Sequence, residues 1–263
     1  MILPSAPFVE KNERAIAKKV RGMKTPPTLA VVLVGNDPAS LSYVRQKERM
    51  AAKLGCGFFL LHIPARAKTN YIIAQIKKLN ANTAVHGIIV QLPLPKQADT
   101  NRVINAIAAK KDVDNLRGNS PFTAPAVKAI WEMLSHTGVP RISDRIAIIG
   151  YGRVIGKPFH AFLRAREFKN IVVADHAIKN IVTLTKDADI VISGVGKANL
   201  VTTVKKGARV IDAGTSVYKG KIVGDVDIAK VRAKAAVITP VPGGIGPLTV
   251  IHLFTNCVIA AQR

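Results

Sequence analysis

The feature that most constrains the fold of this chain is a repeated alternation of short apolar runs with longer mixed stretches that have helical periodicity. Such an alternation is typical of βαβ units that build a parallel sheet. Continuous apolar runs, such as Ile-Ala-Ile-Ile at 146–149 and Ile-Val-Val-Ala at 171–174, predict strands that are buried on both faces. The alternation therefore predicts an α/β fold.

The order of the predicted elements divides the chain into two domains. Strands are predicted at residues 29–34, 57–63, 87–91, 145–149, 170–174, 189–193 and 209–212. Helices are predicted at residues 11–21, 39–53, 71–79, 102–109, 126–135, 155–165 and 248–261. Two segments, 115–125 and 239–247, are rich in glycine and proline, and we interpret them as crossings between domains that hold neither helix nor strand. One domain then comprises residues 1–124 and 247–263, with the last helix returning to it, and the other comprises residues 125–246.

The strongly positive charge leaves two interpretations open. Thirty-nine Lys and Arg residues against sixteen Asp and Glu give a formal net charge of +23 at pH 7, which can indicate a nucleic-acid-binding protein. The cations are scattered in pairs, however, and only 5% of the residues are aromatic, so platforms for stacking bases are scarce. We interpret the charge as a cationic solvated surface that attracts anionic small molecules such as dinucleotides, and we do not expect nucleic acid as a partner.

Several other classes of protein are not expected. No stretch is apolar enough for a membrane span, and the start of the chain lacks the pattern of a signal peptide. Cys56 and Cys257 are far apart, and the six histidines show no spacing typical of metal ligands. We expect a cytoplasmic, reduced protein without a metal site.

A glycine-rich segment, Gly-Tyr-Gly-Arg-Val-Ile-Gly-Lys-Pro at 150–158, lies between a predicted strand and a predicted helix. Its glycines allow a tight turn and let backbone N–H groups approach a pyrophosphate, while the helix N-terminus favours an anion. The spacing G-x-G-x-x-x-G departs from the common G-x-G-x-x-G, and a purely structural turn is the alternative. The context favours a Rossmann-like domain, for which the predicted cofactor-binding residues are Gly150, Tyr151, Gly152, Arg153, Val154, Ile155, Gly156, Asp175, His176, Gly214 and Thr215.

Asp175 bears on the choice between NAD and NADP. It ends the next predicted strand, roughly 20 residues beyond the glycine loop, where a carboxylate can accept hydrogen bonds from the 2′-hydroxyl of the NAD ribose. The same carboxylate repels a 2′-phosphate, although the neighbouring His176 and Lys179 can offset its charge. An ordinary strand-end or helix-capping aspartate is the alternative.

Tyr43 and Lys47 form a candidate pair for proton transfer. They are four residues apart on the predicted helix 39–53 and therefore share a face. Burial beside a phenol lowers the pKa of a lysine toward neutrality, which suits general acid–base chemistry. Taken alone, such a pair is also common on exposed helix surfaces.

Five further segments occur in a characteristic order. They are residues 34–47 (Val-Gly-Asn-Asp-Pro-Ala-Ser, then Tyr43-x-x-x-Lys47), 87–95 (Gly-Ile-Ile-Val-Gln-Leu-Pro-Leu-Pro), 111–114 (Lys-Asp-Val-Asp), 224–227 (Gly-Asp-Val-Asp) and 239–249 (Thr-Pro-Val-Pro-Gly-Gly-Ile-Gly-Pro-Leu-Thr). They resemble the motifs of the bifunctional methylenetetrahydrofolate dehydrogenase/methenyltetrahydrofolate cyclohydrolase family, and the last is close to that family's T-P-V-P-G-G-V-G-P-M-T. Because the matches span nearly the whole chain, it is identified as a member of this family.

The resemblance implies roles for particular residues. Lys47 would carry proton movement in the cyclohydrolase step, with Tyr43 beside it and Gln91 hydrogen-bonded to it. Asp114 would accept the amino and ring N–H donors of the pterin, a bidentate task that suits a carboxylate. The loop 242–246 would line the folate against the nicotinamide. The other substrate-binding residues implied are Leu92, Pro93, Pro242, Gly243, Gly244, Gly246, Pro247 and Thr249.

The resemblance also implies the activity. A folate domain and a Rossmann-like domain would oxidise 5,10-methylenetetrahydrofolate to the 5,10-methenyl form with NADP or NAD. They would then hydrolyse the methenyl form to 10-formyltetrahydrofolate, in the one-carbon metabolism that supplies purine biosynthesis. The resemblance implies a homodimer. The alternatives are the loss of one activity, or a basic non-catalytic α/β module that binds nucleic acid.

The chain departs from the family pattern chiefly where it would meet the dinucleotide. The family's G-R-S is Gly150-Tyr151-Gly152 here, so an arginine able to neutralise a 2′-phosphate is missing, and Arg153 is the nearby cation that can replace it. The family's H-S-x-T is reduced to His176-Ala177-Ile178 after Asp175, and K-D-V-D-G ends in Asn115. Asp225 and Asp227 are interpreted as capping, solvated acids of a tight turn, and Trp131 as a core residue.

Overall fold

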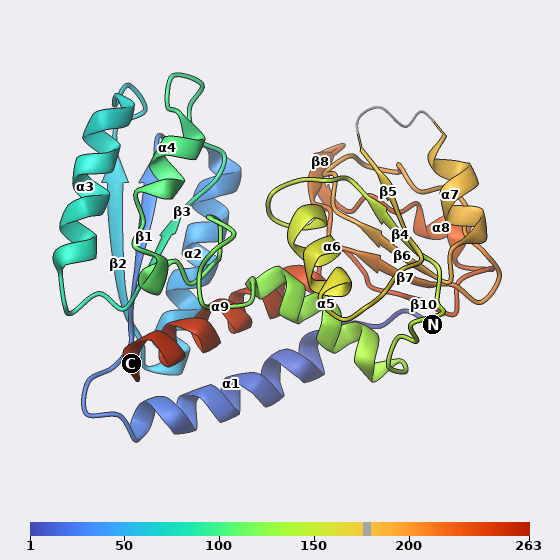
Figure 1. Ribbon diagram of the computed structural model, residues 1–263, viewed down its shortest axis with the longest axis horizontal. Coiled ribbons are helices and arrows are strands. Elements are labelled where there is room, and N and C mark those ends of the chain that lie inside the picture. Colours follow the sequence, from blue (N-terminus) through green and yellow to red (C-terminus); the bar gives the residue numbers. More distant parts are fainter. Residues whose placement is uncertain (176–179) are drawn as a thin grey trace. The chain divides into compact units, whose positions relative to one another are not determined.

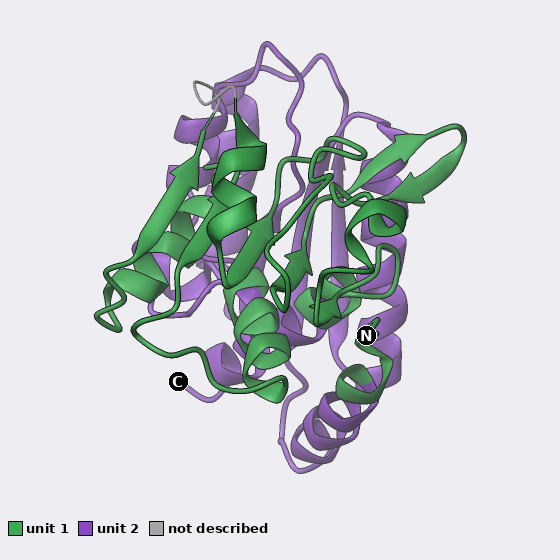
Figure 2. Ribbon diagram, turned by 90° about the vertical axis from the view of Figure 1, so that its right-hand side faces the viewer, with its two compact units in different colours: residues 1–9, 126–249 green, residues 10–125, 250–263 purple. Residues whose placement is uncertain are grey.

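The computed structural model describes residues 1–175 and 180–263 and divides into two compact units, which Figure 2 shows in different colours. Unit 1 comprises Met1–Val9 and Ala126–Thr249, and unit 2 comprises Glu10–Pro125 and Val250–Arg263. The first nine residues were predicted to lie with the first domain, but they belong to unit 1. The reason is a pairing that the sequence does not reveal: Ile2 forms a parallel bridge with Ile238, and Leu3 N donates to Ile238 O at 2.9 Å.

Unit 2 contains a parallel sheet with the strand order β2-β1-β3 (Figure 1). Its strands are β1 (Thr28–Val34), β2 (Gly57–Ile63) and β3 (Gly87–Val90). Its helices are α2 (Pro38–Leu54), α3 (Thr69–Ala81) and α4 (Thr100–Asn105), with a 3-10 turn at Ala109–Lys111. Residues 29–34 of β1 are fully buried, because β1 is the central strand and pairs on both sides. Ile72 and Ile76 of α3 pack in the same core as β1.

Helix α2 has clear local signals at both ends. The Asp37 carboxylate accepts a hydrogen bond from Ser40 N at 2.8 Å, and Pro38 occupies the first turn, where its missing N–H costs nothing. Gly55 ends the helix in the left-handed conformation, with φ of 72°. These caps fix where the helix that carries Lys47 begins and ends.

Unit 1 contains a five-stranded parallel sheet with the order β10-β7-β6-β4-β5 (Figure 1). Its strands are β4 (Ile146–Ile149), β5 (Ile171–Ala174), β6 (Ile190–Ser193), β7 (Arg209–Asp212) and β10 (Val237–Ile238). The chain passes from β4 to β5 on one side and then back to β6 on the other. In open α/β sheets, ligands bind outside the carboxyl ends of the strands at such a switch point. Because β4 lies at this switch point, the loop that follows β4 is the expected ligand-binding loop.

Unit 1 contains the predicted helices at 126–135 and 155–165, with slightly different bounds, and, among the described residues, two short helices besides. They are α5 (Pro125–His136), α6 (Gly156–Arg164), α7 (Ile181–Asp187) and α8 (Ile228–Val231). Helix α1 (Ala6–Arg21) begins in unit 1, and α9 (Ile245–Ala261) begins there and ends in unit 2. No helix of the described residues is long and apolar enough to cross a membrane.

Three structural predictions are wrong in detail. The run Ile-Val-Val-Ala is not buried on both faces, because β5 is an edge strand and its first three residues remain partly exposed. Helix α9 begins at Ile245, inside the segment predicted to lack a helix, because Pro247 lies in the first turn where no N–H is needed. Trp131 is only partly buried, and its ring contacts Phe162 and Arg166.

Several short elements were not predicted. They are α7, α8, β10 and the antiparallel hairpin of β8 (Ser216–Tyr218) and β9 (Lys221–Val223). The hairpin turns at Lys219 and Gly220, whose φ values of 50° and 74° suit a two-residue turn. A lysine at the first position is an uncommon signal for this turn, which explains why the sequence pattern did not indicate it.

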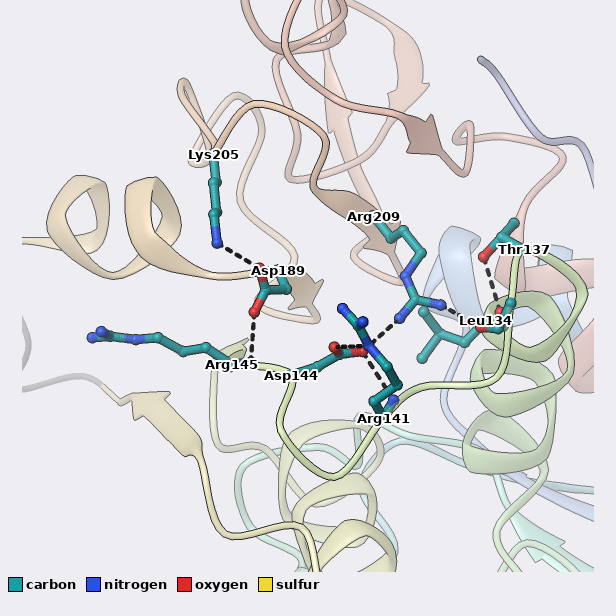
Figure 3. A network of polar contacts seen from close by, with 9 residues as sticks. Leu134, Thr137, Arg141, Asp144, Arg145, Asp189, Lys205 and Arg209 are labelled. Atoms are coloured by element: carbon teal, nitrogen blue, oxygen red, sulfur yellow. Dashed lines mark hydrogen bonds and ion pairs between the residues drawn. The ribbon is translucent and has the colours of Figure 1, made fainter.

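Charged side chains gather at the amino ends of β4, β6 and β7 (Figure 3). Arg209 and Arg141 both donate to the Asp144 carboxylate, at 2.9 and 3.1 Å. Asp189 accepts from Arg145 N at 2.9 Å and pairs with Lys205 at 2.6 Å. This network ties together the strand starts, at the edge of the sheet opposite the carboxyl ends.

Candidate active site

The candidate catalytic lysine of unit 2 is held by a glutamine from a neighbouring strand. Lys47 Nζ, on α2, donates to Gln91 Oε1 at 2.9 Å, and Gln91 directly follows β3. The other end of the amide is also held, because Gln91 Nε2 donates to Leu92 O at 2.9 Å. Lys47 Nζ lies 5.7 Å from the centre of the Tyr43 ring. The predicted group of Tyr43, Lys47 and Gln91 is therefore brought together.

Lys47 and Asp114 influence each other's protonation. Burial lowers the pKa of Lys47, and the nearby Asp114 carboxylate partly restores it. Burial raises the pKa of Asp114 to about 6, with Lys47 acting in the opposite direction. An amine whose pKa is lowered, held within the field of a carboxylate, is better suited to accept and return a proton than an exposed lysine is.

The segment that carries Asp114 is fixed by hydrogen bonds on both sides. The buried Asp112 carboxylate accepts from Leu116 N at 3.1 Å and Arg117 N at 2.9 Å. From α9, Asn256 Nδ2 donates to Val113 O at 2.8 Å. Asp114 is thus presented by a short segment whose backbone is held in place.

Asn115 stands where the family has glycine, and its backbone explains the exchange. Its φ is 52°, in the left-handed region that asparagine tolerates better than most residues. The departure from K-D-V-D-G therefore preserves the turn after Asp114.

The glycine loop of unit 1 follows β4, at the switch point of the sheet. Gly150 has φ of 91°, and a Cβ on it would lie 2.8 Å from Val195 Cγ2. A Cβ on Gly156 would overlap the carbonyl of Gly150, so the first turn of α6 packs directly on the start of the loop. Nothing lies within 4 Å of the place where Gly152 would carry a Cβ. The loop is closed at its base and open at its crest, which fits a pyrophosphate held by backbone N–H groups.

Tyr151 occupies the position of the family's arginine and is bound by a residue of α6. Its Oη shares a hydrogen bond with His160 Nδ1 over 3.0 Å, and Lys157 Nζ lies 5.8 Å from its ring centre. Burial lowers the pKa of His160, with Arg164 adding to the effect. The phenol of Tyr151, hydrogen-bonded to His160, therefore stands where the family has an arginine.

The other predicted cofactor residues lie after the carboxyl ends of strands in the same sheet. Asp175 follows β5 and is exposed, and Gly214 and Thr215 follow β7. His176 was also predicted to bind the cofactor, but with Ala177 and Lys179 it lies outside the described residues. The folate-loop residues from Pro242 to Thr249 belong to unit 1, where Gly243 O accepts from Ser5 N at 2.8 Å.

One group of polar residues was missed, and one interpretation is wrong. Asp225 was interpreted as a solvated acid of a turn, but it is fully buried. Its carboxylate binds Ser193 Oγ and three consecutive backbone N–H groups of residues 195–197. The motif Gly-Asp-Val-Asp marked the position, but no local pattern identifies the donors, which are about 30 residues away in sequence. Asp227, in contrast, caps α8 as a turn acid would.

No group of three His, Cys, Asp or Glu side chains that could hold a metal ion occurs in the part of the chain that the structure describes. The buried thiols Cys56 and Cys257 are both free. Burial raises the pKa of the Cys56 thiol to about 11.

Fold and site define a two-unit α/β protein in which one unit carries a Rossmann-like dinucleotide-binding loop. Models of the tetrahydrofolate dehydrogenase/cyclohydrolase family match the chain: the catalytic domain over residues 5–114 and the NAD(P)-binding domain over residues 124–263. The chain belongs to the tetrahydrofolate dehydrogenase/cyclohydrolase family.

Individual relatives agree with the family models. The "Bifunctional protein FolD 2" of Lactobacillus johnsonii is 39% identical, over 97% of this chain and 94% of the relative. The solved structure of the bifunctional FolD enzyme from Campylobacter jejuni has a TM-score of 0.93 at 31% identity, covering 100% of this chain and 98% of that one. The Trypanosoma brucei enzyme, solved with NADP cofactor and an inhibitor, has a TM-score of 0.93 at 30% identity, covering 100% and 97%.

Proposed function

We propose that this protein oxidises 5,10-methylenetetrahydrofolate to the 5,10-methenyl form with NAD or NADP, and hydrolyses the methenyl form to 10-formyltetrahydrofolate. The observation that carries the proposal is the arrangement of Lys47, Gln91 and Asp114, in which one lysine is held by an amide and lies within the electrostatic influence of a carboxylate. Relatives with this family's two domains are named as bifunctional enzymes.

The roles proposed for the residues follow from their chemistry. Asp114 accepts hydrogen bonds from the amino and ring N–H donors of the pterin and so orients the folate. Lys47, with its lowered pKa, takes a proton from the water that adds to the methenyl carbon. The same amine returns the proton to the folate nitrogen that leaves as the ring opens. The hydroxyl of the adduct loses its own proton to solvent as the formyl C=O forms, so that one water is added and one proton is released overall. Gln91 keeps the amine in place through both transfers.

The shape of the glycine loop supports our proposal for the residues that would hold the dinucleotide. The open crest at Gly152 leaves space for a pyrophosphate, and Gly214 and Thr215 lie at the carboxyl end of β7 in the same sheet. When bound, the nicotinamide supplies the acceptor for the electron pair that leaves the methylene carbon. The remaining predicted site residues, including the segment from Pro242 to Thr249, are proposed as folate contacts on the family resemblance.

We infer that the enzyme discriminates weakly between NADP and NAD. Tyr151, bound to His160, replaces the arginine that the family presents to a 2′-phosphate, and the exposed carboxylate of Asp175 stands after β5. Arg153 and Lys157 favour the extra phosphate. The measurement is kcat/KM for both cofactors at matched ionic strength, in wild type and in Asp175→Ala. A wild-type preference for NADP above roughly a hundredfold, unchanged by the substitution, would contradict a contact between Asp175 and the ribose.

The proposed function is tested on the purified protein with two assays. The first follows methenyltetrahydrofolate formation from the methylene form with NAD or NADP. The second follows hydrolysis of added methenyltetrahydrofolate without any dinucleotide. We expect both reactions, with the second abolished in Lys47→Met. A protein that folds and catalyses neither reaction would overturn the proposal, and one that catalyses only one of them would be monofunctional.

We also propose that the protein works as a cytoplasmic homodimer in one-carbon metabolism, supplying formyl groups for purine synthesis. The support is the resemblance to bifunctional FolD relatives. Sedimentation equilibrium would report a mass of twice the 28.2 kDa chain.

A further inference from the structure

Asp225 places a buried carboxylate among several hydrogen-bond donors of unit 1, with the Asp212 carboxylate close by. Asp225 is fully buried, and Ser193 Oγ donates to its Oδ2 at 2.7 Å. Three consecutive backbone N–H groups donate as well: Val195 to Oδ2 at 2.7 Å, Gly196 to Oδ1 at 2.9 Å and Lys197 to Oδ1 at 2.7 Å. A carboxylate is the side chain that accepts from four donors at once, because it has two oxygens and no N–H of its own.

The same carboxylate also shapes the loop after β7. A Cβ on Gly214 would overlap the Asp225 carboxylate, so the backbone at this position packs on it directly. Asp212 also holds this loop. Its Oδ1 accepts hydrogen bonds from Gly214 N at 3.0 Å and from Asp225 N at 3.1 Å. The segments that follow β6 and β7 are therefore built around two buried acids, of which Asp225 holds the segment after β6.

The segment held by Asp225 is in turn the wall of the glycine loop. A Cβ on Gly150 would lie 2.8 Å from Val195 Cγ2, and a Cβ on Gly194 would lie 2.7 Å from Ile155. Neither loop can shift without moving the other. Contacts thus run without a gap from Asp225 through residues 194–197 to residues 150–156.

We propose that Asp225 is a positioning residue for the dinucleotide, which holds residues 194–197 against the glycine loop before the ligand binds. This inference rests on the proposed binding of NAD or NADP to unit 1. Residues 194–197 include two glycines, so without the carboxylate this segment would have many conformations and three unpaired N–H groups. Ordering such a segment on binding would weaken affinity.

The test uses Asp225→Asn in the full-length protein. The asparagine keeps the shape but turns two N–H donors toward backbone donors. We expect the dissociation constants of NAD and NADP, measured by calorimetry without folate, to rise roughly 10- to 100-fold, since small misplacements in a site have effects of this size. The KM of the dinucleotide should rise more than kcat falls. Asp227→Asn is the matched control, because Asp227 only caps α8 and pairs with Lys230, and it should bind both dinucleotides as wild type does.

Amide hydrogen exchange of the free protein adds a readout that a general loss of stability would not give. In Asp225→Asn, the amides of residues 195–197 should exchange faster than in wild type while those of β4 and β6 stay protected. Ser193→Ala removes one donor and leaves the carboxylate. It should show the same local change in exchange and bind the dinucleotides several-fold more weakly than wild type. This variant provides the test if Asp225→Asn does not fold. Equal affinity in wild type and the folded variants would overturn the inference, whereas a wild type that binds neither dinucleotide would overturn the proposed function instead.

Discussion

At the scale of single residues, the chemistry depends on how burial shifts the pKa values of Lys47 and Asp114 in opposite directions. Burial disfavours the charged form of each, so the amine moves toward neutrality and the carboxyl toward protonation. Their mutual attraction opposes both shifts. The two opposite shifts bring the proton affinities of the amine and the carboxyl closer together, which reduces the driving force that proton transfer requires.

Replacement of Lys47 by methionine should remove the cyclohydrolase activity. A positioned acid–base group contributes about 100- to 10,000-fold to the rate, and methionine keeps the length of the side chain without the amine. The initial rate of methenyltetrahydrofolate hydrolysis measures the loss. Lys53→Met on the same helix is the control, because Lys53 is exposed and only pairs with Glu13 at 3.6 Å. Hydrolysis by Lys47→Met within a few-fold of wild type would contradict the assignment.

Replacement of Asp114 by asparagine should weaken folate binding and change its pH dependence. The pKa of Asp114 is raised to about 6, so its carboxylate, the form that accepts the pterin donors, is lost as the pH falls through this value. The KM for folate in wild type should therefore rise about tenfold between pH 7 and pH 5. Asp114→Asn should bind folate roughly 1.5–3 kcal/mol more weakly at pH 7, with a flat profile and unchanged dinucleotide affinity. Equal weakening of both ligands would indicate a structural role.

The same shift predicts how Asp114 affects stability. Its pKa in the folded protein is above the ordinary value of 3.8, so the folded state binds the proton more tightly than the unfolded state. The contribution is fully present below pH 3.8 and is lost as the pH rises through about 6. Urea unfolding at a series of pH values should show wild type losing stability relative to Asp114→Asn between pH 4 and pH 7. A difference that grows in the opposite direction would contradict this sign.

At the scale of the elements, the dinucleotide unit depends on loops that pack on one another at the carboxyl ends of the strands. Gly156 brings the first turn of α6 against the carbonyl of Gly150, and Val195 closes on Gly150 from the side of β6. The N-terminus of helix α6 adjoins the loop crest, where Lys157 N donates to Gly152 O at 3.0 Å, and a helix N-terminus favours an anion. Gly152, in contrast, does not pack against a neighbouring segment, because nothing lies within 4 Å of the place where its Cβ would be.

Alanine at these two glycines should therefore have different effects. Gly156→Ala forces a methyl group into the carbonyl of Gly150 and should destabilise the protein by about 1–3 kcal/mol, as overpacking does. Gly152→Ala should unfold at the same temperature as wild type but bind NAD and NADP more weakly, because the methyl group fills the open crest. Thermal unfolding measures the loss of stability in Gly156→Ala, and calorimetric titration measures the loss of dinucleotide affinity in Gly152→Ala. A Gly152→Ala variant with wild-type affinity would show that the pyrophosphate does not approach this residue.

At the scale of the whole molecule, the acidic residues are few and several are committed to internal bonds. Of the sixteen Asp and Glu residues, Asp112, Asp144, Asp212 and Asp225 are buried. Their oxygens bind backbone N–H groups or, for Asp144, two arginines. Apart from Asp144, they bind backbone N–H groups and a serine hydroxyl rather than Lys or Arg side chains, and the formal net charge of +23 gives the protein a positive field toward solvent.

This field should make ligand binding sensitive to salt. Raising the ionic strength from about 0.01 to 0.15 M shortens the screening length from roughly 30 to 8 Å. The KM of both dinucleotides should rise, and more steeply for NADP because it carries the additional phosphate. Steady-state rates over this range measure the effect, with kcat as the internal control. A KM that is independent of salt would mean that the surface cations do not contribute to binding.

The sequence by itself determined what depends on neighbouring residues along the chain. Asp37 and Gly55 delimit α2, the apolar runs indicate the buried strands β4 and β6, and Gly150 with its following glycines indicates the loop. Helical spacing placed Tyr43 and Lys47 on one face, and the family motifs pointed to Gln91 and Asp114. Caps, periodicity and left-handed turns are short-range effects, and they can be predicted because the residues that cause them are adjacent.

Only the tertiary structure decided which strands lie at an edge and which acids are buried. β5 has the composition of a central strand but pairs on one side, and the first residues of the chain pair with Ile238. Asp225 resembles Asp227 in sequence, yet it finds its donors 28 to 32 residues away. The free energy of burying a carboxylate depends on whether such distant donors converge on it, and that convergence is a property of the folded sheet.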